Sequence, residues 1–116
     1  MRVYLRGDVC TIDPEPAGSS GQRDARLAVI IQNDIGNRYS PVLIVAAITA
    51  GEVARYDVHI AIRPPEGGLL QPSLVHTNQI RTVPKERVGR YVGRLSPSTM
   101  RRVDEALKIS LGLVPL

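Results

Sequence analysis

Short apolar segments separated by polar turns fill most of this 116-residue chain. Two of them, residues 27–31 and 42–48, are continuous apolar runs, which is typical of short strands buried on both faces. Residues 13–24 are rich in proline, glycine and serine and predict a long surface loop. The pattern as a whole predicts strands at residues 3–12, 27–31, 42–48, 59–62, 74–83 and 91–95, with turns at 32–34 and 67–68.

The last part of the chain changes to a helical pattern. Ser96 and Pro97 have the residue types of a helix cap and first helical position, and Gly112 and Pro115 are expected to end the helix. A run of strands followed by one amphipathic helix predicts a mainly β fold, a small barrel with a packed C-terminal helix, in a single domain over residues 1–116. The apolar stripe of this helix comprises Met100, Val103, Leu107, Leu111 and Val114.

The charge of the chain, +4 overall, favours a polyanionic partner. Residues 1–58 hold six basic and seven acidic residues, whereas residues 59–116 hold nine basic and four acidic residues. Thirteen of the fifteen basic residues are Arg, whose planar guanidinium matches phosphate oxygens, although a GC-rich genome would produce the same excess.

Several function classes are excluded by what the sequence lacks. Cys10 is the only cysteine, so neither an internal disulfide nor a cysteine zinc site is expected. No apolar run approaches the roughly 20 residues of a membrane span, which favours a cytoplasmic protein without membrane contact. Phosphate-binding loops, dinucleotide fingerprints, metal-spaced histidines and nucleophile elbows are absent, so the sequence shows none of the usual catalytic signatures.

The two histidines, His59 and His76, could in principle form an acid–base pair of the ribonuclease type. His59 lies in an alternating strand, where a structural or surface role is favoured, and a non-catalytic role is also favoured for His76. Taken together, the strand pattern and the basic charge indicate a basic β-barrel that binds nucleic acid.

Longer motifs carry a resemblance that covers nearly the whole chain. The most specific is Q-N-D-I-G-N-R-Y-S-P at residues 32–41, which continues into I-V-A-A-I-T at 44–49. Others are R-G-D-V at 6–9, Q-I-R-T-V at 79–83 and V-D-E-A-L-K-I-S-L at 103–111. With these motifs in this order, the chain resembles the MazF/PemK toxins of type II toxin–antitoxin systems. The resemblance implies an SH3-like barrel of the CcdB/PemK type that forms a homodimer.

The resemblance also implies an activity and its partners. MazF/PemK toxins are mRNA interferases, endoribonucleases that cut single-stranded RNA at short recognition sequences. They use no metal or cofactor, and they leave a 2′,3′-cyclic phosphate and a 5′-hydroxyl. A cognate antitoxin neutralises them by laying an acidic tail over the RNA site.

The catalytic pair of the family falls on Arg26 and Thr49. Negative charge grows on the phosphate oxygens when a ribose 2′-hydroxyl attacks, and a fixed guanidinium stabilises that charge. Arg is nearly always protonated, so Arg26 is expected to stabilise charge or give a proton to the leaving oxygen. Thr49 is expected to orient or stabilise the phosphate, and the general base stays open.

Further RNA contacts are expected around this pair. The family usually has Gly-Gly before the catalytic Arg and Pro after it, whereas this chain has Arg23-Asp24 and Leu27. This departure is expected to affect loop flexibility and RNA sequence preference. For Gln79 and Arg81, strand pairing or dimer packing is the alternative role, and for Asn33 and Asp34 the alternative is to hold the loop. The expected RNA-binding residues are Gln22, Arg23, Asn33, Asp34, Gln79 and Arg81.

Two other functions fit a barrel of this type, because a fold does not fix a function. A gyrase poison of the CcdB type resembles its relatives in ending on Trp-Gly and one more residue, whereas this chain has no Trp and ends Val114-Pro115-Leu116. A degenerate member that only binds an antitoxin or RNA is the other alternative, and the presence of Arg26 and Thr49 argues against it.

Overall fold

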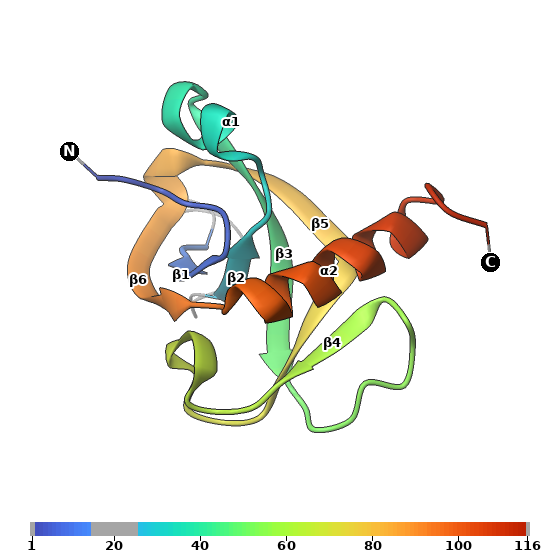
Figure 1. Ribbon diagram of the computed structural model, residues 1–116. Helices are drawn as coiled ribbons and strands as arrows, with labels where there is room; N and C mark the ends of the chain where they lie inside the picture. Colours follow the sequence, from blue (N-terminus) through green and yellow to red (C-terminus); the bar gives the residue numbers. More distant parts are fainter. Residues whose placement is uncertain (1, 15–25, 116) are drawn as a thin grey trace.

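Six antiparallel strands form one sheet in the computed structural model, which describes residues 2–14 and 26–115. The strand order is β4-β5-β3-β2-β1-β6, so that β3 lies inside the sheet and β4 and β6 lie at its edges. Figure 1 shows the sheet curling on itself, with the long helix α2 across one side. The strands are β1 (Asp8–Ile12), β2 (Arg26–Ile30), β3 (Val42–Ala50), β4 (His59–Ile62), β5 (Ser73–Pro84) and β6 (Val88–Arg94).

The two continuous apolar runs are covered on both faces, as their composition predicts. On one side, Val29 of β2 and Ile48 of β3 pack into a core cluster that includes Val103 of the long helix. On the other side, Ile30 and Val45 belong to a second cluster with apolar residues of β1, β5 and β6. Two clusters on opposite faces are the packing expected of a sheet curled into a small barrel.

The C-terminal helix α2 (Pro97–Ser110) begins as the sequence predicts. Ser96 is its N-cap and accepts a hydrogen bond from the Thr99 amide, which satisfies a donor at the helix start. Val103 is fully buried, but Leu111 is 57% exposed, so the predicted apolar stripe is wrong at its end. No helix among the described residues has the length and apolar character needed to cross a bilayer.

The structure differs from the prediction at the start of the first strand and after the end of the second strand. The first strand starts only at Asp8, because the chain turns at Gly7, which has a positive φ of 96°. The Gly7 amide and carbonyl bond to Ile30 and Leu95, which fixes this turn against two other segments. Residues 32–34 were expected to be a simple turn, but they lead into a short helix, α1 (Asp34–Tyr39).

A glycine-rich contact draws the two edges of the sheet together. The 3-10 turn η1 (Glu66–Gly68) follows β4 and lies against β6; a second such turn, η2 (Lys85–Arg87), joins β5 to β6. Gly68 has a φ of 72°, and a Cβ there would overlap the carbonyl oxygen of Val92. A Cβ on Gly93 would overlap the backbone of Gly67 in the same way. These close backbone contacts give the sheet its small, barrel-like form, which confirms the predicted fold class.

Candidate active site

The two residues expected to form the catalytic pair lie on neighbouring strands. Arg26 is the first residue of β2, and Thr49 is next to the last residue of β3. Leu27 pairs with Ile48, and the same register continued by one residue places Arg26 opposite Thr49. Directly opposed residues send their side chains to the same face of a sheet. Both residues are exposed, so they can meet a ligand together.

Thr49 has a partner that the sequence does not indicate. Its Oγ1 lies 2.6 Å from Nε2 of His76 on β5. In the ladder Thr49 pairs with Leu74 and Ala47 pairs with His76, so Thr49 and His76 are diagonal neighbours on one face. Thr49 is exposed, whereas His76 is only 9% exposed. The imidazole therefore supports the threonine hydroxyl from below the surface.

Two more aromatic rings lie beyond His76, toward the edge strand β4. His59 on β4 pairs with His76, and the centroids of their rings are 4.4 Å apart. The ring of Tyr56 lies edge-on to His59 with centroids 5.5 Å apart. Burial lowers the pKa of His76 below its ordinary value, and the charge of His59 lowers it further. The Nδ1 atom of His76 is buried and has no hydrogen-bond partner in the part of the chain that the structure describes.

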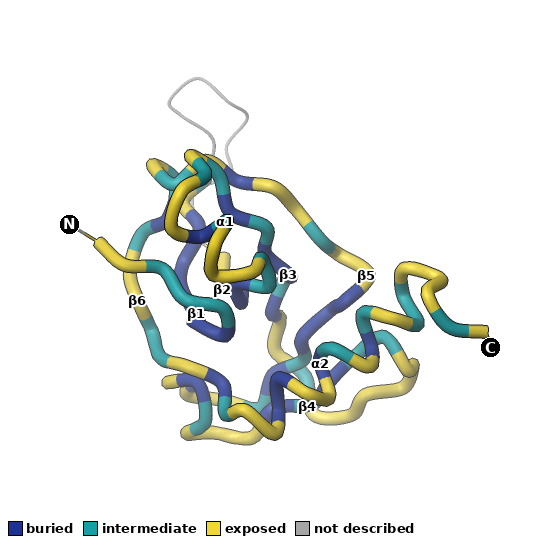
Figure 2. The backbone as a smooth tube through the Cα atoms, turned by 45° about the horizontal axis from the view of Figure 1, so that its top comes forward, coloured by how far each residue is buried: buried dark blue, intermediate teal, exposed yellow. Residues whose placement is uncertain are grey.

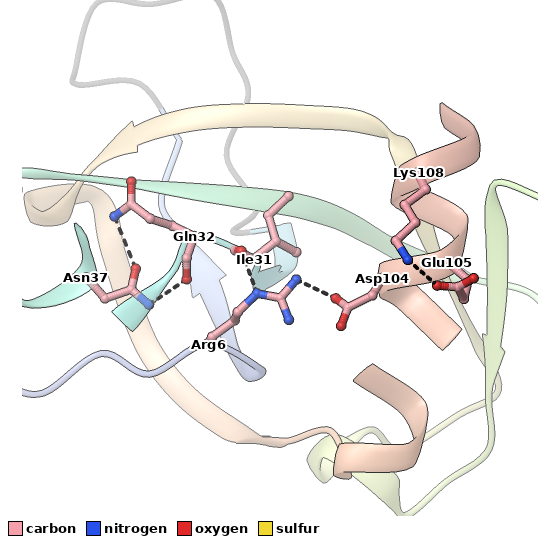
Figure 3. Close-up of polar contacts among 7 residues, drawn as sticks. All are labelled: Arg6, Ile31, Gln32, Asn37, Asp104, Glu105 and Lys108. Carbon is pink, nitrogen blue, oxygen red and sulfur yellow. Dashed lines mark hydrogen bonds and ion pairs between the residues drawn. The ribbon is translucent and has the colours of Figure 1, made fainter. Parts of the chain in front are cut away.

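The most specific motif of the sequence builds the turn between β2 and β3. Asn33 is the N-cap of α1, and its side chain accepts a hydrogen bond from the Gly36 amide. Asn37 Nδ2 donates to Asp34 Oδ1 over 3.0 Å. It also donates to the carbonyl of Gln32 over 2.9 Å, as Figure 3 shows. These contacts account for Asn33 and Asp34 as residues that shape this turn, and their contact with RNA stays a prediction.

Arg6 fastens the same turn to the C-terminal helix. Its backbone amide donates to Asp34 Oδ1, and its Nε donates to the carbonyl of Ile31 over 2.7 Å. Its terminal nitrogen lies 2.6 Å from Asp104 of α2 (Figure 3). The R-G-D-V and V-D-E-A-L motifs, far apart in sequence, thus meet through one ion pair.

The motif turn lies far from the catalytic pair. α1 is at the end of the sheet where β3 begins, and Thr49 is at the end where β3 finishes (Figure 1). The seven residue steps from Val42 to Thr49 span roughly 23 Å at about 3.3 Å per residue. Within one chain, Asn33 and Asp34 are therefore not part of the cluster around Thr49.

The remaining expected RNA contacts differ in how the structure places them. Gln79 and Arg81 are both exposed on β5, along the part of this strand that Figure 2 shows as largely exposed. Gln79 belongs to a bulge, because Ala46 pairs with Ile80 while Ala47 already pairs with His76. Gln22 and Arg23 lie outside the described residues.

Cys10 is a free, buried residue of β1. Burial raises the pKa of its thiol to about 11, an effect that Arg2 opposes and Asp8 reinforces. Because the thiolate is the nucleophilic form, this thiol is poorly suited to catalysis at neutral pH.

Comparison with known proteins agrees with the motifs and the fold. The model of the family described as PemK-like, MazF-like toxin of type II toxin-antitoxin system matches residues 5–111. Endoribonuclease EndoA of Bacillus subtilis (strain 168) is 44% identical over 113 residues, which are 97% of this chain and 97% of that protein. Endoribonuclease MazF of Staphylococcus epidermidis is 47% identical over 112 residues, covering 96% of this chain and 93% of that protein.

Solved structures show the same architecture. An endoribonuclease in complex with its cognate antitoxin, from mycobacterial species, superposes with a TM-score of 0.80 at 26% identity, covering 98% of this chain and 100% of that chain. A MazE-MazF structure from Deinococcus radiodurans reaches a TM-score of 0.79 at 16% identity over 98% and 100% of the two chains, a similarity of fold alone. The family match and the two curated relatives show that this chain belongs to the PemK-like, MazF-like toxins of type II toxin-antitoxin systems.

Proposed function

We propose that this chain is an endoribonuclease toxin that cuts single-stranded RNA without a metal ion. The products are a 2′,3′-cyclic phosphate and a 5′-hydroxyl. The observation that carries this proposal is the placement of Arg26 opposite Thr49, both exposed, at one end of β2 and β3. The curated relatives, named endoribonucleases and 44% and 47% identical to this chain, support it independently.

The chemistry needs charge stabilisation more than a strong nucleophile of the protein. The 2′-hydroxyl of the RNA loses its proton as its oxygen forms a new bond to phosphorus, and the bond from phosphorus to the 5′-oxygen breaks as that oxygen takes up a proton. The guanidinium of Arg26 forms paired, charge-assisted hydrogen bonds to the oxygens on which negative charge grows. The hydroxyl of Thr49 gives one more hydrogen bond to the same phosphate. Arg26 is available for this task, because it makes no side-chain hydrogen bond or ion pair with other described residues.

The partner of the toxin is a cognate antitoxin with an acidic tail that covers the RNA site. The solved complexes of similar proteins with antitoxin support a partner of this kind. The net charge of +4 supports an electrostatic contribution to both RNA and antitoxin binding. The working form is a homodimer in the cytoplasm. Binding of the acidic tail should weaken as salt rises, because salt screens exposed charges.

A cleavage assay on a long single-stranded RNA in EDTA tests the activity. Wild type should cut at a short recurring sequence and leave cyclic phosphate ends, whereas Arg26→Ala and Thr49→Ala should lose at least about a hundredfold in rate. Arg38→Ala is the matched control, because Arg38 is an exposed arginine on α1, at the other end of the sheet. Equal losses in Arg38→Ala would show that total charge, and not the catalytic pair, carries the activity.

The ends and the metal requirement are read from the same reaction. Cutting that occurs only when Mg²⁺ is restored would contradict the metal-free mechanism. Antitoxin-free wild type that cuts no RNA but blocks DNA gyrase would support the CcdB-like alternative instead. An intact protein inactive in both assays would point to a degenerate binding module.

A further inference from the structure

We propose that His76 is a positioning residue of the RNA-cleaving site, which donates a hydrogen bond from Nε2 to Thr49 Oγ1. This contact turns the hydroxyl hydrogen of Thr49 outward, toward the phosphate that is cut. The inference rests on the proposed ribonuclease function and adds a residue to its site. Its direct basis is the 2.6 Å distance between Nε2 and Oγ1.

The burial of His76 needs a reason beyond packing. Its side chain is almost fully covered, yet its Nδ1 atom has no hydrogen-bond partner among the described residues. A buried polar atom without a partner is costly, and an apolar side chain of similar size would fill the space without that cost. Among the described residues, the contact of Nε2 with Thr49 is the one hydrogen bond of this side chain. The imidazole is therefore explained by what it does to Thr49.

The position of the proton follows from the same unpaired atom. A proton on Nδ1 would leave a buried N–H without an acceptor and would use up the Thr49 hydrogen in a bond to Nε2. A proton on Nε2 leaves Nδ1 as a bare lone pair, and unpaired buried acceptors are tolerated better than unpaired N–H groups. The second arrangement frees the Thr49 hydrogen for the phosphate. The Nε2–H bond to Oγ1 also makes that hydroxyl a stronger donor, because linked hydrogen bonds polarise one another.

His76 keeps this neutral form during the reaction. An imidazolium would place a second buried N–H at Nδ1, where no acceptor is described, and would face His59 of β4 at a ring distance of 4.4 Å. Tyr56 contacts His59 edge-on, and Thr49 of β3 contacts the His76 ring at Nε2. Burial and His59 both lower the pKa of His76. These surroundings suit a fixed neutral donor and not a general base.

Three substitutions at residue 76 separate this role from simple packing. His76→Gln carries an amide N–H at the reach of Nε2, His76→Asn carries it at the reach of Nδ1, and His76→Leu carries none. For each variant, kcat and KM are measured for cleavage of a short RNA that contains the mapped cleavage site. The measurement is made in the wild-type and the Thr49→Ala backgrounds. Thermal unfolding of each variant shows that it is folded.

We expect kcat to fall about tenfold in His76→Leu and His76→Asn, with KM changed less than about twofold. His76→Gln should stay within about threefold of wild type. In the Thr49→Ala background none of the three should have a further effect, because residues that act through each other are not additive. The ratio of wild-type to His76→Gln activity should be constant between pH 5.5 and 8, since the role needs no change of protonation.

Imidazole nitrogen NMR of the free protein gives a readout that does not depend on cleavage. The expected result is a neutral ring with its proton on Nε2, and a changed Nε2 resonance in Thr49→Ala. An active enzyme with the proton on Nδ1, or additive losses in the double variants, would overturn the role of His76 alone. A low-pH loss of activity in wild type that is absent from His76→Gln would overturn it in favour of a proton acceptor. Wild type that cuts no RNA would contradict the proposed function, and the catalytic role of His76 with it, whatever the nitrogen resonances show.

Discussion

Gln32 and Asn37 hydrogen-bond to each other twice across the start of α1. The Gln32 Nε2 atom donates to Asn37 Oδ1 over 3.1 Å, and Asn37 Nδ2 donates to the Gln32 carbonyl oxygen over 2.9 Å. Asn37 is only 1% exposed, so water cannot replace these bonds. Gln32 Nε2 also donates to the carbonyl oxygen of Val42, which ties the turn to the start of β3. The side-chain amides of Gln32 and Asn37, both in the motif at residues 32–41, thus shape the turn from β2 to β3.

Asn37→Ala should lower the free energy of unfolding by about 2–3 kcal/mol, because it removes the hydrogen bonds that the buried Asn37 amide makes with Gln32 and Asp34. Urea unfolding followed by circular dichroism measures this change. Asn33→Ala is the matched control: it removes an exposed cap and should cost only about 1 kcal/mol. A smaller effect at Asn37 than at Asn33 would show that the paired amides do not stabilise the turn.

Gly68→Ala should lower the free energy of unfolding by more than about 3 kcal/mol, for two reasons. The new Cβ would overlap the backbone of β6, and the positive φ is unfavourable for alanine. Gly112→Ala isolates the second effect. Gly112 has nearly the same φ, 71°, but nothing lies within 4 Å of its Cβ position. Gly112→Ala should lower the free energy of unfolding by only about 1 kcal/mol. Equal midpoints in urea unfolding would contradict the close contact between η1 and β6.

Arg26→Lys should reduce single-turnover cleavage by about a hundredfold, although the positive charge remains. An ammonium group cannot form the paired hydrogen bonds of a guanidinium to one phosphate. Thr49→Ser keeps the hydroxyl and should stay within about fivefold of wild type. Activity retained in Arg26→Lys would mean that Arg26 acts as a simple point charge.

The carboxyl of Glu66 links stability to pH. Burial by itself raises its pKa, but hydrogen bonds from the Ser96 amide and from the hydroxyls of Thr99 and Ser96, with the charge of Arg102, lower the pKa overall. A pKa that is lower in the folded state gives stability that is present above the unfolded value and is lost as pH falls through the folded value. Thermal unfolding should therefore show Glu66→Gln less stable than wild type at pH 7. The difference should shrink below pH 4, and a difference that grows on acidification would contradict this coupling.

The parts of the fold that depend on local pattern could be predicted from the sequence. β3 is a continuous apolar run, and α2 has both a Ser96 cap and an apolar stripe. α1 could not be predicted, because six residues are too few to form a stable helix alone. Besides its local amide contacts, it is held by residues distant in sequence, such as Arg6, whose amide donates to Asp34.

The site could be predicted only as far as the family resemblance reaches. Arg26 and Thr49 have no distinguishing pattern as single residues, and their approach depends on the pairing register of β2 and β3. The contact of Thr49 with His76 depends further on the bulge in β5. A strand bulge changes which residues face each other, and the position of the bulge cannot be predicted from the sequence.

The glycine contact between η1 and β6 has a dynamic consequence. The ladder order of the described strands places β4 and β6 at opposite ends, so the sheet edges meet through packing of η1 on β6 and not through a ladder between them. A packing contact of this kind can open without breaking a hydrogen-bond ladder. β2 and β3 have a hydrogen-bonded strand on each side, so they open only when the sheet itself comes apart. We therefore expect local opening of the barrel to begin at this contact, while Thr49 lies on an inner strand that opens only with the sheet.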